Sequence, residues 1–224
     1  MTVNEWDASG ALGNLGGLLT VKVSGPGGTD SISVKLAGTN PSAGQVVAYL
    51  AAKADSGGFD KILQHESKMT HFDARGEPVK SFDNGYGMCQ MTNPRPSYEQ
   101  CWNWQMNVDC GLALYAAKRQ AAIRYLSQNG RTFTEDQASR EAIARWNGGS
   151  YHVWDGAKNA WVRNPVILCD SKTGNIGWDI TKPSNQGQSE AALHARDAAK
   201  YAHRPGANDA WGYFGVCYAD RILS

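Results

Sequence analysis

The sequence has little of what marks membrane proteins, nucleic-acid-binding proteins or secreted precursors. It carries 22 basic and 21 acidic residues, for a formal net charge of +1, so no overall field attracts nucleic acid or an anionic membrane. No apolar run approaches the roughly 20 residues that cross a bilayer. The start of the chain has neither a basic nor an apolar region, so we expect no secretory signal. We therefore expect no nucleic-acid partner and no membrane insertion.

Histidines are few, and their spacing excludes a common zinc motif. His65 and Glu66, followed by His71, look at first like a zinc-protease signature. Zinc binding from one helix needs two histidines four residues apart, on the same face. His65 and His71 are too far apart for this and would point in different directions. We expect no metal site and no cofactor.

The length and the cysteine content allow one sizeable domain in either redox state. A chain of 224 residues that is 42% hydrophobic can bury a core, with one main domain and an appendage as the natural arrangement. The 5 cysteines suit two disulfides and one thiol in an oxidising compartment, or reduced and partly buried thiols. The sequence does not decide the pairing.

Hydrophobic periodicity and turn residues predict a mainly helical chain with a β appendage. Residues 18–23 and 31–36 read as the strands of a hairpin, so we interpret 1–40 as an appendage or the end of an upstream β-domain. Residues 41–224 would form the main domain. In it we expect an irregular segment at 147–187, and helices at 44–56, 59–69, 97–128, 134–146 and 188–203.

Glu66 interrupts an apolar pattern in the second of these helices. On a helix it shares a face with four apolar side chains, Phe59, Ile62, Leu63 and Met69. Helices normally place glutamate on their solvent side. A carboxylic acid held against hydrocarbon has its charged form disfavoured, which suits a general acid that works near neutral pH. The alternative is a glutamate that caps a neighbouring helix or reaches solvent.

Three motifs in order resemble a known superfamily. Glu66–Ser67 stands at a helix end, and the turn sequence GYGMCQ follows at 85–90. The sequence ARWNGG follows at the end of a later helix, at 144–149. Together they resemble the ES, GLMQ and AYN patterns of goose-type lysozymes and soluble lytic transglycosylases. The resemblance covers residues 44–155 and implies a mainly α (α+β) lysozyme-like fold, with a short β-hairpin or loop region beside the cleft.

The resemblance also implies roles for single residues. Glu66 matches the catalytic acid, while Ser67, Gln90 and Asn147 match positions that orient or bind substrate. Cys89 stands where the family usually has methionine. Trp146 replaces a tyrosine whose hydroxyl is associated with lytic transglycosylase chemistry, which favours hydrolysis.

Glycoside cleavage with inversion needs a second carboxylate as base, roughly 6.5–9.5 Å from the acid. The segment after Glu66 offers Asp73, Glu77 and Asp83. Asp83 lies just before the turn, near an auxiliary aspartate of goose-type enzymes, and is our first choice, with Glu77 second. Each could instead be a solvated turn residue. A lytic transglycosylase needs no second acid, because the muramic 6-hydroxyl attacks in place of water.

Aromatic side chains cover the flat apolar faces of sugar rings. The best-placed candidates for glycan contact are Tyr86 in the motif turn and three residues at or after the third motif, Trp146, Tyr151 and Trp154. Other aromatic residues follow a helical pattern and are expected in the core, namely Trp102, Trp104 and Tyr115.

We expect a monomeric muramidase that cleaves the β-1,4 bond between N-acetylmuramic acid and N-acetylglucosamine in peptidoglycan. The alternatives are a lytic transglycosylase, a glycan-binding module that does not cut, and a Cys89 nucleophile. The substrate lies in the periplasm or extracellular wall, so a chain without a signal would travel another route. By analogy, it would be the C-terminal part of a type VI secretion or phage-tail-like effector, with an immunity protein as partner.

Overall fold

The computed structural model describes residues 15–81 and 84–224 and has an α+β fold. Helices hold 38% of the residues and strands 20%, so the expected mainly α class is wrong. The error lies chiefly in 147–187, which was expected to be irregular but contains four strands, while the C-terminal tail contains a fifth. These strands are three or four residues long, too short to show a period of two in the sequence.

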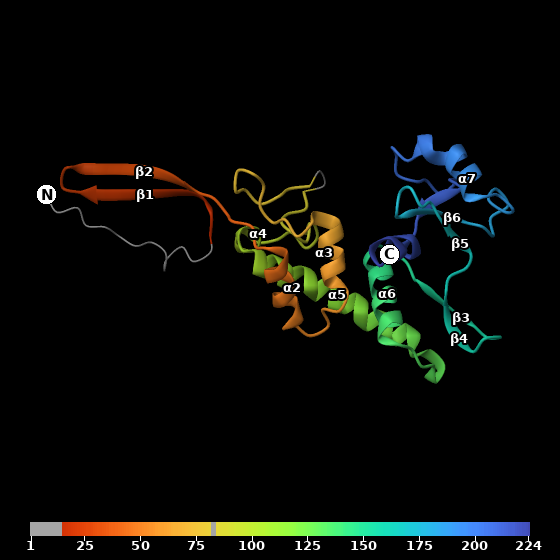
Figure 1. Cartoon of the computed structure of the whole chain (residues 1–224). Helices are drawn as coiled ribbons and strands as arrows, with labels where there is room; N and C mark the ends of the chain where they lie inside the picture. The colour runs from red at the N-terminus through yellow and green to blue at the C-terminus, as the bar shows by residue number, and fades with distance from the viewer. Residues whose placement is uncertain (1–14, 82–83) are drawn as a thin grey trace. The chain divides into compact units, whose positions relative to one another are not determined.

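The structure divides into two compact units, Met1–Ala54 with Leu63–Ala113, and Asp55–Ile62 with Leu114–Ser224. The helices α3 and α5 contribute residues to both. The elements that lie wholly or partly in the first unit are β1 (Gly17–Gly25), β2 (Gly28–Leu36), α2 (Ala43–Ala51), α3 (Phe59–Ser67), α4 (Tyr98–Trp102) and α5 (Trp104–Leu126) (Figure 1).

The second unit combines short helices with two small antiparallel sheets. The strands β3 and β4 pair with each other, and β5, β6 and β7 form a three-stranded sheet in that order. The elements are η1 (Gln128–Gly130), α6 (Glu135–Trp146), β3 (His152–Asp155), β4 (Ala160–Arg163), β5 (Ile167–Cys169), β6 (Ile176–Asp179), α7 (Glu190–Asp197), η2 (Ala198–Lys200), β7 (Trp211–Tyr213) and α8 (Gly215–Ile222).

Local sequence explains where several helices begin. Ser42, Ser97 and Thr134 each accept a hydrogen bond from the backbone of a glutamine three residues on, whose side chain binds back. Such capping boxes satisfy backbone donors that a helix start leaves unpaired. The expected helix at 97–128 is broken at Asn103, whose Oδ1 instead accepts from the N–H groups of Gln105 and Met106 at the start of α5.

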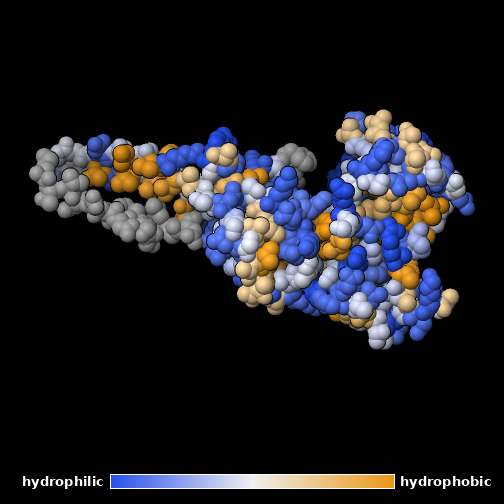
Figure 2. Space-filling view, in the orientation of Figure 1, coloured by the Kyte–Doolittle hydropathy of each residue, from blue (hydrophilic) through white to orange (hydrophobic). Residues whose placement is uncertain are grey.

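The predicted N-terminal hairpin is confirmed, and it has an apolar face. The register pairs Leu19 with Val34 and Val21 with Ile32, so these side chains share one face of the ribbon. Ile32 is 64% exposed. Hydrophobic residues accordingly gather along the hairpin in Figure 2. A two-stranded hairpin is marginally stable alone.

Each unit has its own buried side chains. In the first unit they come from α2, α3, the following loop, α4 and α5, and include Val46, Leu63, Phe72, Met88, Trp102 and Val108. The second unit has two clusters. One is built from Ile176, Trp178, Leu193 and Trp211 of the three-stranded sheet and α7, and the other from Leu126, Ala138 and Trp161. Of the aromatic residues expected in the core, Trp102 and Tyr115 are buried and Trp104 is half-buried.

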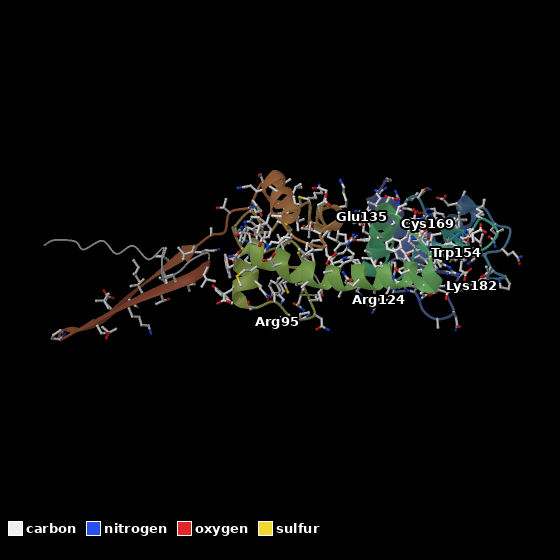
Figure 3. All side chains as sticks on the ribbon, turned by 90° about the horizontal axis from the view of Figure 1, so that it is seen from below. Arg95, Arg124, Glu135, Trp154, Cys169 and Lys182 are labelled. Carbon is white, nitrogen blue, oxygen red and sulfur yellow. A yellow bond between two sulfur atoms is a disulfide. The ribbon has the colours of Figure 1, made fainter. Side chains whose placement is uncertain are left out.

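One disulfide joins Cys169 of β5 to Cys217 of α8 (Figure 3, where Cys169 is labelled). The other three cysteines, Cys89, Cys101 and Cys110, are free thiols. The chain thus follows neither of the two arrangements considered from the sequence. Among the described residues, no helix is both long enough and apolar enough to cross a lipid bilayer.

Candidate active site

Glu66 lies in the last turn of α3, and its side chain is exposed. The expectation that it packs against hydrocarbon is therefore wrong. Phe59, Ile62 and Leu63 are buried as predicted, but α3 ends at Ser67. Met69 is buried from beyond the helix, so its spacing from Glu66 does not define a common helical face.

The backbone directly after Glu66 and Ser67 is left-handed at two successive residues. Lys68 and Met69 have φ values of 53° and 56°, a region that side chains with a Cβ rarely occupy. The Lys68 N–H donates to Gln64 O at 3.1 Å and the Met69 N–H to Leu63 O at 3.2 Å. These bonds satisfy two backbone carbonyl groups in the last turn of α3, and the left-handed residues turn the chain sharply. Such backbone strain is frequent at functional sites.

The loop after α3 is held by two polar side chains, the exposed Asn40 and the buried His71, rather than by a regular sheet. Asn40 Oδ1 accepts hydrogen bonds from the N–H groups of His71 and Phe72, at 2.7 and 2.8 Å, and Asn40 Nδ2 donates to Phe72 O at 2.8 Å. The His71 Nδ1 accepts from the Met88 N–H at 3.1 Å, so Nε2 carries the proton and donates to Cys101 O at 2.9 Å. Burial lowers the pKa of His71 to about 4.

The motif turn at 85–90 needs both of its glycines. A Cβ on Gly87, where φ is +72°, would lie 2.5 Å from the His71 ring and 2.7 Å from Asn107 Nδ2. A Cβ on Gly85 would lie 2.6 Å from Gln90 O. Asn107 of α5 is buried and binds the same turn: its Oδ1 accepts from the Cys89 N–H at 3.0 Å and its Nδ2 donates to Tyr86 O at 3.1 Å.

Two residues with an expected role in substrate binding make local hydrogen bonds. Ser67 Oγ donates to Leu63 O at 3.1 Å, within α3. Gln90 Nε2 donates to Gly87 O at 2.6 Å, and Gln90 has a φ of 50°. The chain therefore closes the turn at a further left-handed residue that is not glycine. Tyr86 is half-buried between strand-like bridges to Lys80 and Met91.

Two of the three candidate loop acids have structural partners. Glu77 lies 2.7 Å from Lys35 Nζ of β2. Asp73 accepts hydrogen bonds from the N–H groups of Glu77 and Arg75, and these bonds, the one from Glu77 foremost, lower its pKa. Asp83, the first choice for a base, lies outside the described residues.

The third motif, residues 144–149, lies at the C-terminal end of α6, in the second unit. The Trp146 ring packs against Phe59 and Tyr115, with ring centroids 5.7 and 6.3 Å apart. Asn147 is the C-cap of α6. Tyr151 is buried, and its hydroxyl donates to Asp220 at 2.6 Å, so its ring packs inside this unit. Trp154 is half-buried, with the Arg131 guanidinium 4.3 Å from its ring centroid (Figure 3).

A second glutamate, Glu141 of α6, is fully buried behind the third motif. Its Oε2 accepts from the N–H groups of Tyr151 and His152 at 2.9 Å, and from His152 Nδ1 at 3.2 Å. Arg145 Nη2 lies 2.8 Å from Oε1. Burial disfavours its charge, but the bonds from His152 and the nearby Arg145 outweigh this and lower the pKa of Glu141. Glu141 is thus held as an anion that orders the segment after the third motif, and it is unsuited to donate a proton.

Cys89 is buried at the motif turn. Burial raises the pKa of its thiol strongly. A thiol without access to its thiolate is a poor nucleophile, which argues against the cysteine-nucleophile alternative.

Within residues 15–81 and 84–224, no group of three or more histidine, cysteine or acidic side chains could hold a metal ion. The structure places Glu66, Ser67, Glu77, Tyr86 and Gln90 in the first unit, and Trp146, Asn147, Tyr151 and Trp154 in the second.

Sequence reasoning missed three buried polar residues that shape the motif segments, His71, Asn107 and Glu141. Asn107 and Glu141 interrupt apolar helical patterns, which is a signal that a sequence can show. His71 offers no such local signal.

No protein-family model, curated protein or solved structure matches this chain. Functional assignment therefore rests on the residues themselves.

Proposed function

We propose that this chain is a peptidoglycan glycosidase that hydrolyses the β-1,4 bond between N-acetylmuramic acid and N-acetylglucosamine. One observation carries the proposal. The exposed Glu66 stands at the strained end of α3, directly before a loop whose GYGMCQ turn is built around the buried side chains of His71 and Asn107. A rigid support of this kind suits a site that must hold a substrate in place.

In the proposed reaction, Glu66 donates its proton to the glycosidic oxygen, and the bond from that oxygen to C1 of the muramic acid breaks. The oxocarbenium-like carbon is attacked by water from the opposite face, and a carboxylate takes up the proton of that water.

Asp83 remains our first choice for the base. Glu77 is paired with Lys35, and Asp73 is bound by the backbone of its own turn. Both therefore have a role in the structure. A lytic transglycosylase would need none of the three acids.

The disulfide between Cys169 and Cys217 supports action outside the cytoplasm, because such bonds persist in oxidising compartments. We further propose delivery of this chain to the periplasm or cell wall as part of a secreted effector. A producing cell would then need an immunity protein against it.

Mass spectrometry of muropeptides after digestion of purified sacculi tests the proposed function. We expect fragments with muramic acid at the reducing end. Dominant 1,6-anhydromuramic ends would identify a transglycosylase. Intact sacculi would favour a module that binds glycan without cutting it.

A further inference from the structure

A cleft of about 630 Å³ opens in the first unit beside the motif turn. Its lining is cationic and aromatic, with Arg75, Lys80, Arg95, Tyr86, Tyr98 and Trp102, together with Glu77, Pro78, Pro96 and Cys101. Tyr86 belongs both to this lining and to the GYGMCQ turn, so a ligand in the cleft would touch the turn that follows Glu66 in the chain.

The cations of the cleft differ in their partners. Arg75 is paired with Asp73 at 3.1 Å. Lys80 Nζ lies 5.5 Å from the centroid of the Tyr86 ring, and Lys80 and Arg95 also line a smaller adjoining cavity. Arg95, labelled in Figure 3, is exposed. Neither Lys80 nor Arg95 forms an ion pair among the described residues, so both are available to an anionic ligand.

Two aromatic side chains, the buried Trp102 and the exposed Tyr98, form part of the cleft wall. Trp102 is 7% exposed and packs against Phe72, with ring centroids 6.0 Å apart. The Tyr98 ring lies 6.2 Å from that of Trp102, and its hydroxyl donates to Gly16 O. Aromatic side chains beside two cations suit a short ligand that carries both carboxylates and small apolar groups.

We infer that this cleft binds the peptide stem of peptidoglycan through its carboxylates. The inference rests on the proposed function, since it concerns the same substrate. A stem peptide is short and combines carboxylates with alanine methyl groups. A wall polymer of repeated phosphates lacks apolar groups that could pack against the aromatic side chains of the cleft. The chain would thus prefer glycan that still bears its peptides.

Binding of a disaccharide that the enzyme cannot cut tests this preference. The ligand is N-acetylglucosaminyl-N-acetylmuramic acid with its tetrapeptide, compared with the same disaccharide without peptide, by calorimetry on the full chain. We expect wild type to bind the peptide-bearing form about 10-fold more tightly, as one or two charge-assisted hydrogen bonds would give. We expect that preference to weaken at high salt.

Two variants and two controls locate the effect. Lys80→Gln and Arg95→Gln should each remove most of the preference, with the affinity for the peptide-free form unchanged. Lys118→Gln and Arg124→Gln change the same charges at exposed positions of α5 and should leave the preference intact. Equal affinity of wild type for both forms would overturn the inference, as would an equal loss in the controls.

Labelling of the cysteines gives a second readout. Cys101 lines the cleft and is half-buried, whereas Cys110 lies on α5. The peptide-bearing disaccharide should slow the alkylation of Cys101 and not that of Cys110, and unchanged alkylation of Cys101 would count against the inference. A glycerol-phosphate oligomer is the competing ligand. If it binds more tightly than the peptide-bearing disaccharide, and Arg95→Gln weakens that binding, the ligand of the cleft is a phosphate polymer and not the peptide stem.

The outcomes separate this inference from the proposed function. If the protein cleaves sacculi but shows no preference for the peptide-bearing disaccharide, only the proposed binding of the peptide stem in the cleft is rejected. If the preference depends on Lys80 and Arg95 but sacculi are not cleaved, only the proposed glycosidase activity is rejected.

Discussion

The ring of His71 accepts a hydrogen bond from the backbone N–H of Met88 at 3.1 Å. This bond ties the chain just after Glu66 to the middle of the GYGMCQ turn, across 17 residues of sequence. Because Nδ1 is the acceptor, the bond requires a neutral His71 ring. The loop that carries the candidate site is therefore sensitive to protonation of one buried side chain.

The stability of the protein should fall as the pH drops from 6.5 towards 4. The unfolded chain takes up a proton on His71 near pH 6.5, whereas burial holds the folded pKa at about 4. The unfolded state thus binds more protons in this range, and the free energy of unfolding should decrease by about 3 kcal/mol in total. Urea unfolding at several pH values measures it.

His71→Gln keeps one acceptor and one donor and should remove this part of the pH dependence. His65→Gln, at an exposed residue of α3, is the matched control and should retain it. The same slope in wild type and His71→Gln would contradict the assignment.

Glu66→Gln should abolish cleavage of peptidoglycan without unfolding the protein. An amide cannot donate the proton that the leaving oxygen needs, and loss of a general acid lowers the rate by about 10²-fold or more. Release of soluble muropeptides measures activity, and circular dichroism reports the fold. Glu99→Gln, an exposed glutamate of α4, should keep wild-type activity. Turnover within a few-fold of wild type in Glu66→Gln would reject Glu66 as the acid.

The second carboxylate can be identified by a pair of substitutions. Asp83→Asn should lower turnover strongly with little change in binding, and Glu77→Gln should lower it less. Glu77→Gln also releases Lys35, but the pair is exposed at 51% and 36%, so stability should change by less than about 1 kcal/mol. With an inverting mechanism the first products have the α configuration, which NMR detects during the reaction. Full activity in Asp83→Asn would return Asp83 to the status of a turn residue.

Reduction of the disulfide should destabilise the second unit. The bond between Cys169 and Cys217 closes a loop of 48 residues, for which the chain-entropy estimate is about 4 kcal/mol as an upper value. Dithiothreitol should therefore lower the melting temperature of wild type. The double variant Cys169→Ser with Cys217→Ser should already melt lower and should not respond to the reductant. A similar response in both proteins would trace the effect to something other than this bond.

Cys89→Ser should keep most of the cleavage activity. Burial raises the pKa of this thiol strongly, so the thiol fills space behind the motif turn and does not attack substrate. If this substitution stops turnover while circular dichroism stays native, a cysteine nucleophile would replace the glycosidase mechanism.

Features with local causes were readable from the sequence. The hairpin formed by β1 and β2 follows from two β-type runs on either side of a glycine-rich turn, and α6 begins where Thr134 and Gln137 form a capping box. Both depend on residues a few positions apart, which a sequence shows directly. The motif turn and its glycines were also recognised, although the contacts that require Gly87 were not.

Tertiary structure decided the rest, because it depends on partners distant in sequence. The strands β3 to β7 are too short to carry a pattern and exist only through their pairing. Glu66 is exposed in the last turn of α3, and Met69 reaches the core through a left-handed backbone rather than along the helix. The role of His71 needs Asn40, Met88 and Cys101, each at least 17 residues away, so only the folded chain could reveal it.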